Sequence, residues 1–392
     1  SSITICIFYV FCDIINLESL IIKKKSYFMV WSLFGFSKEN YLGVDFGESS
    51  IKIVELEDSK GAPFLKNYAV ASLIDVPENL NGAPSHKPFF SENQYAKTVG
   101  SILDKLNIKA KKAFFSLPIY PSFSTTIEIP LMSEKEMDQA VPLEARKYVP
   151  IPLNEVVLDW NFLGKTRSDS TEKMRIFIVA VPNNIVQSYI SIAHQNKLKV
   201  EAMELETFSS ARAVLGPNEE RPVMIVDIGA NSTDVAISYK GQVEMSHNFE
   251  ISGFNFTYAI AKSLNIDINR AEQLKRSAGL LAGGGEQELS SIMFPLLDAV
   301  IEEIRRAAAN YEQKYGRPIK KVILAGGSAN LKGLINYFVI QLNIVVGLDI
   351  PFLSIKYQPA LEKTLRELGP ELAVACGLAL KGFAAKRQKQ EK

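Results

Sequence analysis

Cysteine and histidine are both scarce in this sequence, with three of each among 392 residues. Three cysteines cannot build a disulfide framework, and they do not have the spacing of a zinc site (Cys6, Cys12 and Cys376). Their scarcity favours a reducing compartment. The histidines lie far apart in the sequence, so we do not expect a Ser-His-Asp triad or a histidine metal site.

A strong net charge is also missing. Lys and Arg together number 44 and Asp and Glu 43, which gives a formal net charge of +1 at pH 7. This balance does not favour nucleic acid as a partner. What is present is an ordinary globular composition, 47% hydrophobic and 22% charged, over a length that fits two or more domains.

A long uninterrupted apolar run is absent even from the N-terminal segment, which comes nearest to one. The run that begins near Ile3 is interrupted by Asp13 and Glu18 and is followed by three lysines. This pattern fits neither a signal peptide nor a regular membrane span. Met29 is a plausible translation start. We therefore expect residues 1–28 to be a non-native or disordered extension, with a membrane anchor as the alternative.

Two apolar β runs in residues 223–237 flank a short polar turn, which predicts a hairpin. Gly229 lets the backbone turn sharply and bring its N–H groups close to an anion. The hydroxyls of Ser232 and Thr233 can donate to phosphate oxygens. Two carboxylates in the motif need a cation or a water between themselves and a phosphate, and the first suits a hydrated Mg²⁺ (Asp227 and Asp234). One such turn alone is weak evidence, because most are structural loops.

A second copy of this pattern occupies residues 41–56, again with a strand, an Asp-x-Gly turn, hydroxyls and a strand. It contains Asp45, Gly47 and two adjacent serines (Ser49 and Ser50). Lys52 stands seven positions after the aspartate, where Asp234 stands in the other copy, and a lysine there can reach phosphate oxygens as a point charge.

A third informative stretch joins a buried strand to paired glycines in residues 321–331. Gly326 and Gly327, followed by Ser328, would let a flat ring or a ribose lie against the backbone. On an upstream helix, Glu272 and Lys275 stand on one face at i,i+3, which is by itself typical of a surface ion pair. A glycine pair of this kind is weak evidence by itself. Its position after both hairpins in the sequence supports its interpretation as a binding loop.

Between the two hairpins, residues 121–197 read as a β-α-β-β-α block with its own apolar pattern and no residues typical of a catalytic site. Ser133 and Glu136 form a capping box that begins its first helix. Pro142 should then kink or end that helix. We interpret this block as an inserted subdomain that makes contacts. The last helix should run from Gly369 to Phe383, before a charged tail without regular structure.

Two phosphate hairpins with an aspartate each, followed by a glycine-pair loop, resemble the actin-like ATPase superfamily, which includes sugar kinases, heat-shock chaperones, actin, MreB and FtsA. Within it, the sequence resembles the PilM family of type IV pilus assembly proteins. The stretches that narrow the resemblance are 115–118, 144–150, 159–160, 371–373 and 377–380.

The resemblance implies an α/β actin-like ATPase fold, with two RNase H-like halves around a nucleotide cleft and an inserted 1C subdomain of the FtsA/PilM type. It assigns the chain to subdomains as follows: 29–120 and 198–222 to subdomain 1A, 121–197 to 1C, 223–255 and 320–384 to 2A, 256–319 to 2B, and 385–392 to the charged tail.

The resemblance also implies the site residues for ATP and Mg²⁺. They are Asp45, Gly47, Ser49, Ser50 and Lys52 for the β- and γ-phosphates, Asp227, Gly229, Asn231, Ser232, Asp234 and Gly253 for the opposite phosphate face, Glu272 and Lys275 for ribose and adenine, and Gly326, Gly327 and Ser328 beneath the adenosine. Asp45 and Asp227 would hold the metal through water. Asp227 and Glu206 are the candidate catalytic groups. Ala230 and Asn231 stand where relatives have glycine, so at most weak ATP hydrolysis is expected.

The function implied is a cytoplasmic ATP-binding component of the type IV pilus platform at the inner membrane. Its nucleotide state would be coupled to the cytoplasmic N-terminal peptide of a PilN-like membrane protein. Other platform proteins and further copies of this chain are expected partners, and membrane association would be indirect. The alternatives are an FtsA-like cell-division filament protein and a small-molecule kinase of the same superfamily, which would need a catalytic aspartate facing an acceptor pocket.

Overall fold

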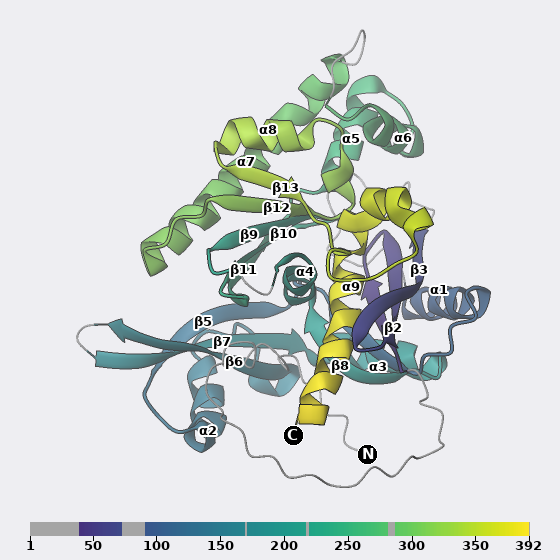
Figure 1. Ribbon diagram of the computed structural model, residues 1–392. Coiled ribbons are helices and arrows are strands. Elements are labelled where there is room, and N and C mark those ends of the chain that lie inside the picture. Colours follow the sequence, from purple (N-terminus) through teal and green to yellow (C-terminus); the bar gives the residue numbers. More distant parts are fainter. Residues whose placement is uncertain (1–38, 73–90, 169–170, 217–218, 281–286, 392) are drawn as a thin grey trace.

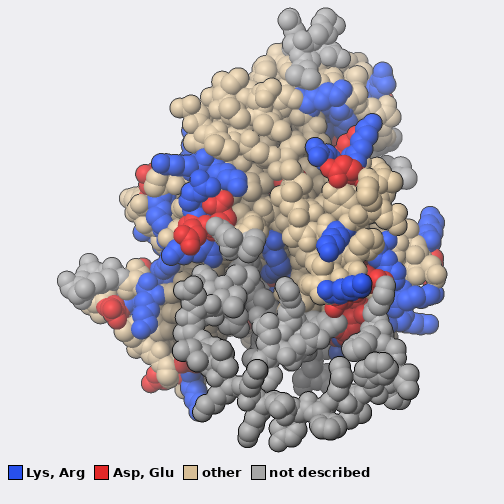
Figure 2. Space-filling view, in the orientation of Figure 1, with Lys and Arg blue, Asp and Glu red and all other residues tan. Residues whose placement is uncertain are grey.

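The computed structural model describes residues 39–72, 91–168, 171–216, 219–280 and 287–391. The expectation for residues 1–28 concerns a segment outside the described residues. Two α/β halves lie one above the other, with helices between them and a smaller three-stranded sheet to one side (Figure 1). On the face shown in Figure 2, positive and negative side chains are interspersed, as the balanced composition predicts.

The first half is built on a five-stranded sheet with the order β3-β2-β1-β4-β8. The first three strands pair antiparallel, and β4 and β8 add in parallel. The strands are β1 (Asn40–Phe46), β2 (Ser50–Ser59), β3 (Ala62–Ser72), β4 (Lys112–Leu117) and β8 (Lys199–Leu205). Because β1 is covered on both faces, it is a nearly continuous apolar run.

The second half repeats this topology in the order β11-β10-β9-β12-β13, with the same antiparallel and parallel pairings. Its strands are β9 (Val223–Ile228), β10 (Thr233–Tyr239), β11 (Gln242–Phe249), β12 (Lys321–Ala325) and β13 (Val345–Leu348). The repeat confirms two RNase H-like halves, because each predicted hairpin occupies the same place in its own sheet.

Helices cover the outer faces of both sheets (Figure 1). The first sheet packs against α1 (Glu92–Lys105) and α3 (Asn183–Gln195). The second half carries α5 (Gly253–Leu264), α6 (Ile268–Ala278), α7 (Gln287–Tyr315) and α8 (Leu334–Leu342). Their apolar stripes form a core with the upper face of the second sheet, around Phe256, Leu297 and Tyr311.

Two helices, α4 (Glu206–Val214) and α9 (Glu362–Glu391), lie between the halves. They cross so closely that a Cβ on Gly377 would lie 1.8 Å from the Ser209 carbonyl oxygen. The sequence predicted the start of α9 at Gly369 and an irregular charged tail, and both predictions were wrong. The helix begins one to two turns earlier, with Pro370 inside it, and continues to Glu391.

The inserted subdomain has a three-stranded sheet of its own, with the order β5-β7-β6, covered by α2 (Glu134–Ala145). Its strands are β5 (Phe123–Pro130), β6 (Val156–Ser168) and β7 (Thr171–Pro182). The predicted capping box at Ser133 is present. The helix α3, which the sequence assigned to this block, packs against α1 and stacks Tyr189 on Phe46 of β1, so it covers the sheet of the first half. By packing, the insertion therefore ends with β7.

Three short 3-10 helices complete the regular structure of the described residues: Leu153–Glu155, Gly327–Asn330 and Pro359–Leu361. None of the helices in this part of the chain has the length and hydropathy needed to span a membrane.

Candidate functional site

The first hairpin places Asp45 opposite Lys52 across the β1–β2 pair. The Lys52 ammonium lies 3.2 Å from an Asp45 carboxylate oxygen. Burial acts to lower the pKa of Lys52, but the nearby carboxylates of Asp45, Glu371, Asp227 and Glu206 outweigh it, so the pKa is raised and the lysine stays charged. Gly47 makes room for this side chain, because a Cβ there would lie 2.5 Å from the ammonium nitrogen.

The second hairpin places Asp227 opposite Asp234 across the β9–β10 pair. Burial is the main cause that raises the pKa of Asp227, to about 6, and Asp45 raises it further although Lys52 acts in the opposite direction. Burial also raises the pKa of Asp234, together with the charges of Asp227 and Glu48. The site therefore concentrates negative charge and has an electrostatic use for a cation.

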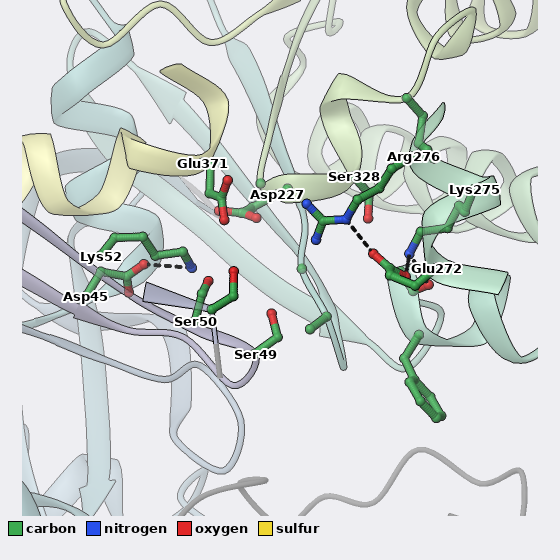
Figure 3. Close-up of a pocket in the computed structure, with 18 of the residues that line it drawn as sticks. Asp45, Ser49, Ser50, Lys52, Asp227, Glu272, Lys275, Arg276, Ser328 and Glu371 are labelled. Carbon is green, nitrogen blue, oxygen red and sulfur yellow. Dashed lines mark hydrogen bonds and ion pairs between the residues drawn. The ribbon is translucent and has the colours of Figure 1, made fainter. Parts of the chain in front are cut away.

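Residues from both halves line one cavity of about 560 Å³, which lies between the two hairpins and extends toward α6 (Figure 3). This volume is within the range of small-molecule and cofactor sites, roughly 300–1,000 Å³. Twelve predicted residues are on its wall: Asp45, Ser49, Ser50, Lys52, Asp227, Gly229, Gly253, Glu272, Lys275, Gly326, Gly327 and Ser328. The structure thus brings together the three motifs that were identified separately in the sequence.

Five predicted residues lie off this wall: Gly47, Glu206, Asn231, Ser232 and Asp234. Asn231 is turned toward the first hairpin, where its side chain hydrogen-bonds the Glu48 carboxylate. Burial raises the pKa of Glu48 to about 7 in spite of this bond. The two hairpin tips, which belong to different halves, are thereby in direct contact.

The glycines at the cavity are required by close approaches. Gly326 has a φ of 83°, and a Cβ there would lie 2.2 Å from the Asp227 carboxylate. A Cβ on Gly253 would lie 2.6 Å from the Ser328 hydroxyl oxygen. The Gly253 N–H donates to the Gly229 carbonyl at 2.9 Å, which packs the start of α5 onto the second hairpin.

At the other end of the cavity, Lys275 is buried beside Glu272, 2.7 Å from its carboxylate (Figure 3). Its ammonium also donates to the Gly253 carbonyl at 2.8 Å and to the Thr257 hydroxyl at 2.7 Å. All three of its N–H bonds are therefore in use. Burial acts to raise the pKa of Glu272, but the lysine and three hydrogen bonds lower it to about 2. This pair joins α5 to α6 and holds a charged carboxylate at the cavity wall.

Sequence reasoning missed several wall residues, among them Arg276, Glu371 and Phe254. Arg276 donates to Glu272 at 2.7 Å, one helical turn away, and its position at i+4 was a readable signal. Glu371 lies on α9, and its carboxylate is directed toward Asp227 in Figure 3. Its place in the site depends on how α9 crosses the two halves, which no local pattern encodes.

Glu206 is the first residue of α4 and directly follows Leu205, where β8 ends. Burial and the charges of Asp45, Asp234 and Asp227 raise its pKa well above the ordinary value. Within the described ranges, no three acidic, histidine or cysteine side chains are arranged to hold a metal ion directly. A metal held through water, as the sequence predicted, needs no such cluster.

Two halves of identical strand order, two helices between them and a cavity lined from both halves define the actin-like ATPase fold. The solved structure of MreB 5 of Spiroplasma citri bound to AMPPNP shares this fold, with a TM-score of 0.53 at 11% identity over 90% of this chain and 98% of that one.

The family model described as type IV pilus assembly protein PilM matches residues 43–383, and the chain belongs to this family. A solved structure named as a PilM–PilN type IV pilus biogenesis complex is similar, with a TM-score of 0.74 and 26% identity over 88% of this chain and 98% of that one. The cell division protein FtsA of Neisseria meningitidis is 23% identical over 240 residues, which is 53% of this chain and 58% of FtsA. The chain thus spans about half the length of its FtsA relatives.

Proposed function

We propose that the cavity binds ATP and that its occupancy controls binding of a PilN-like peptide. The observation that carries ATP binding is the pair of matched hairpins facing one cavity, with a charged lysine between them. Ser49, Ser50 and Lys52 would bind the phosphates from one side and the backbone at Gly229 from the other. Glu272 with the loop at Gly326 would hold the nucleoside.

The acidic groups fit a hydrated Mg²⁺. One carboxylate oxygen of Asp45 and one of Asp234 are buried without a hydrogen-bond partner in the described structure. Unpaired buried oxygens of this kind are suited to accept from metal-bound water. Asp45 and Asp227 would hold the ion through such waters, and the ion would screen both carboxylates from the triphosphate.

Turnover is proposed to be weak. Burial and the neighbouring carboxylates of Asp45, Asp234 and Asp227 raise the pKa of Glu206, the candidate base, well above its ordinary value, which favours its protonated form. A protonated carboxyl cannot accept a proton from water. Such a cleft is better suited to a binding switch than to rapid hydrolysis.

The partner proposed is the cytoplasmic N-terminal peptide of a PilN-like inner-membrane protein. A solved family member with which this chain shares most of its fold is in a complex with PilN. The inserted subdomain, with a core of its own, is the proposed contact region. The protein would lie in the cytoplasm, reach the inner membrane through this partner, and contact other platform proteins and further copies of itself.

Calorimetry with a synthetic PilN-like N-terminal peptide from the same organism tests this function. We expect peptide affinity to differ at least about fivefold with and without saturating Mg²⁺-ATP, the lower end of common allosteric coupling. Equal affinities would contradict the switch, and absence of peptide binding in both states would contradict the partner. ATP turnover stimulated by sugars would instead support the kinase alternative.

A further inference from the structure

Glu244 on β11 connects the second half to the inserted subdomain through a buried charge cluster. Its side chain is 2% exposed and lies 2.8 Å from the Arg175 guanidinium of β7 and 3.0 Å from that of Arg317. The Tyr311 hydroxyl of α7 donates to the same carboxylate at 2.6 Å. We call these four residues the Glu244 cluster.

The backbone is shaped to place this carboxylate. In the β10–β11 pair, Ile237 lies opposite Met245 and Ser238 opposite Val243, so Glu244 is the extra residue of a β-bulge. Bulges redirect a side chain that regular pairing would place elsewhere. Here the bulge is in β11, which pairs with β10. β10 carries Asp234 and is one of the two strands of the second hairpin.

The contact extends beyond the four side chains. The Thr126 hydroxyl of β5 donates to the Glu244 carbonyl oxygen at 2.7 Å, and Lys314 of α7 donates to the Thr126 carbonyl at 3.3 Å. Arg317 lies over the Tyr239 ring, 3.7 Å from its centroid, and Arg175 lies 5.3 Å from the Tyr315 centroid. Both guanidiniums are therefore held by a carboxylate and by aromatic rings.

The middle of β7 is held by two sets of contacts. Phe177 and Val179 belong to the apolar core that contains the first sheet and its helices and extends to strands of the second sheet, and Phe177 contacts the Phe208 ring of α4. Arg175, two residues before Phe177, reaches Glu244 in the second half. The chain enters the insertion from β4 and leaves it into α3, both elements of the first half. If the second half rotated relative to the first, Glu244 would move with it and would exert a force on the inserted subdomain through Arg175.

We propose that Glu244 is the positioning residue through which the nucleotide-binding second half sets the placement of the inserted subdomain. This inference rests on the proposed function in one respect, since it requires that ATP binds in the cavity. It does not require that the inserted subdomain binds a PilN-like peptide. Closing of the halves on nucleotide would move β11 and, through Arg175, β7 and β5. The Glu244 cluster suits this role because buried, closely packed contacts change between discrete arrangements and do not deform continuously.

Hydrogen exchange of the full chain with and without Mg²⁺-ATP tests the inference without any peptide. In the wild type we expect exchange in β5 and β7 to change at least about fivefold on ATP addition, in keeping with common coupling strengths. Glu244→Gln, which keeps the size of the side chain but removes its charge and one of its two acceptor oxygens, should abolish that change while ATP still protects the β1–β2 and β9–β10 hairpins. Arg175→Met provides a second variant that breaks the contact from the other side.

Lys173→Met is the matched control, because Lys173 pairs with Glu128 at 3.7 Å entirely within the insertion. It should keep the wild-type response. Hairpin protection in the wild type without any change in β5 and β7 would overturn the inference, as would a full response in both cluster variants. Absence of hairpin protection by ATP would contradict the proposed function first, so the two failures are distinguishable.

Discussion

At the residue scale, the site depends on three glycines, because it has no room for a Cβ atom at their positions. Gly47, Gly253 and Gly326 each occupy a place where a Cβ would lie within 2.6 Å of a polar group of the site. Such contacts are far closer than van der Waals packing allows. The glycines are therefore required by the closeness of the charged groups.

Replacing Gly253 tests this requirement directly. In Gly253→Ala the new methyl group would meet the Ser328 hydroxyl at 2.6 Å and the Gly229 carbonyl oxygen at 3.1 Å. We expect ATP affinity to fall about tenfold, or about 1.4 kcal/mol, as measured by calorimetry. Gly216→Ala is the control, since a Cβ there meets nothing within 4 Å. Equal affinity in Gly253→Ala and Gly216→Ala would contradict the assignment.

Removing magnesium tests the role of the carboxylates. Without the ion, Asp45 and Asp227 would face the triphosphate directly, so we expect ATP affinity in EDTA to be at least about tenfold lower than in Mg²⁺. Asp227→Asn should reduce that ratio, because one of the two charges that need the ion is gone. An ATP affinity that does not depend on Mg²⁺ in the wild type would exclude the proposed metal role.

The hairpins could be identified from the sequence because each is local: strand, turn and strand lie within sixteen residues. Asp45 and Gly229 were found in this way, and both line the cavity. Glu371 and Phe254 were missed because their positions depend on packing between distant segments. The contact of Asn231 with Glu48 also depends on the distance between the two halves. A local sequence motif does not determine that distance.

At the element scale, α9 ties the halves together, and the sequence underestimated its length. The small residue Gly377 is where α9 crosses α4. The start at Glu362 was missed because Gly369 and Pro370 are typical of a helix boundary. Tertiary contacts compensate here: the Pro370 carbonyl oxygen accepts from the Gly326 N–H at 2.9 Å.

α9 is held to the first half by Glu204, which contacts Lys381 at 2.5 Å and forms two bonds with Arg212. Burial acts to raise the pKa of Glu204, but the two cations lower it to about 2. Burial and the charge of Arg212 lower the pKa of Lys381 in spite of Glu204. The Glu204 carboxylate faces both cations, so removing its charge should affect stability more than removing either cation alone.

Glu204→Gln should lower the free energy of unfolding at pH 7 by about 3 kcal/mol, since it leaves two buried cations without a counter-charge. A lowered carboxyl pKa stabilises the fold above the unfolded value near 4.5, and this contribution is lost as pH falls toward 2. The difference between wild type and variant, measured by urea unfolding, should therefore shrink below about pH 4.5. A difference that stays constant from pH 7 to pH 4 would contradict this assignment.

At the scale of the whole molecule, two sheets of the same strand order enclose the cavity, and the inserted subdomain contacts both halves. The repeated topology was implied by the resemblance to the actin-like ATPase superfamily, which rests on the two hairpins and the glycine-pair loop. The boundary of the insertion was not, because α3 follows β7 without a break and only its packing assigns it to the first half. The Glu244 cluster likewise joins residues more than 60 positions apart and has no sequence signature.

The central claim is that hairpins from different halves form a single nucleotide site. The most direct measurement is calorimetric titration of Mg²⁺-ATP into the wild type, Asp45→Asn and Asp227→Asn. The account predicts one ATP per chain for the wild type, and for each variant an affinity at least about tenfold weaker, or about 1.4 kcal/mol. Unchanged affinity in both variants, or loss in one alone, would contradict a site shared by the two halves.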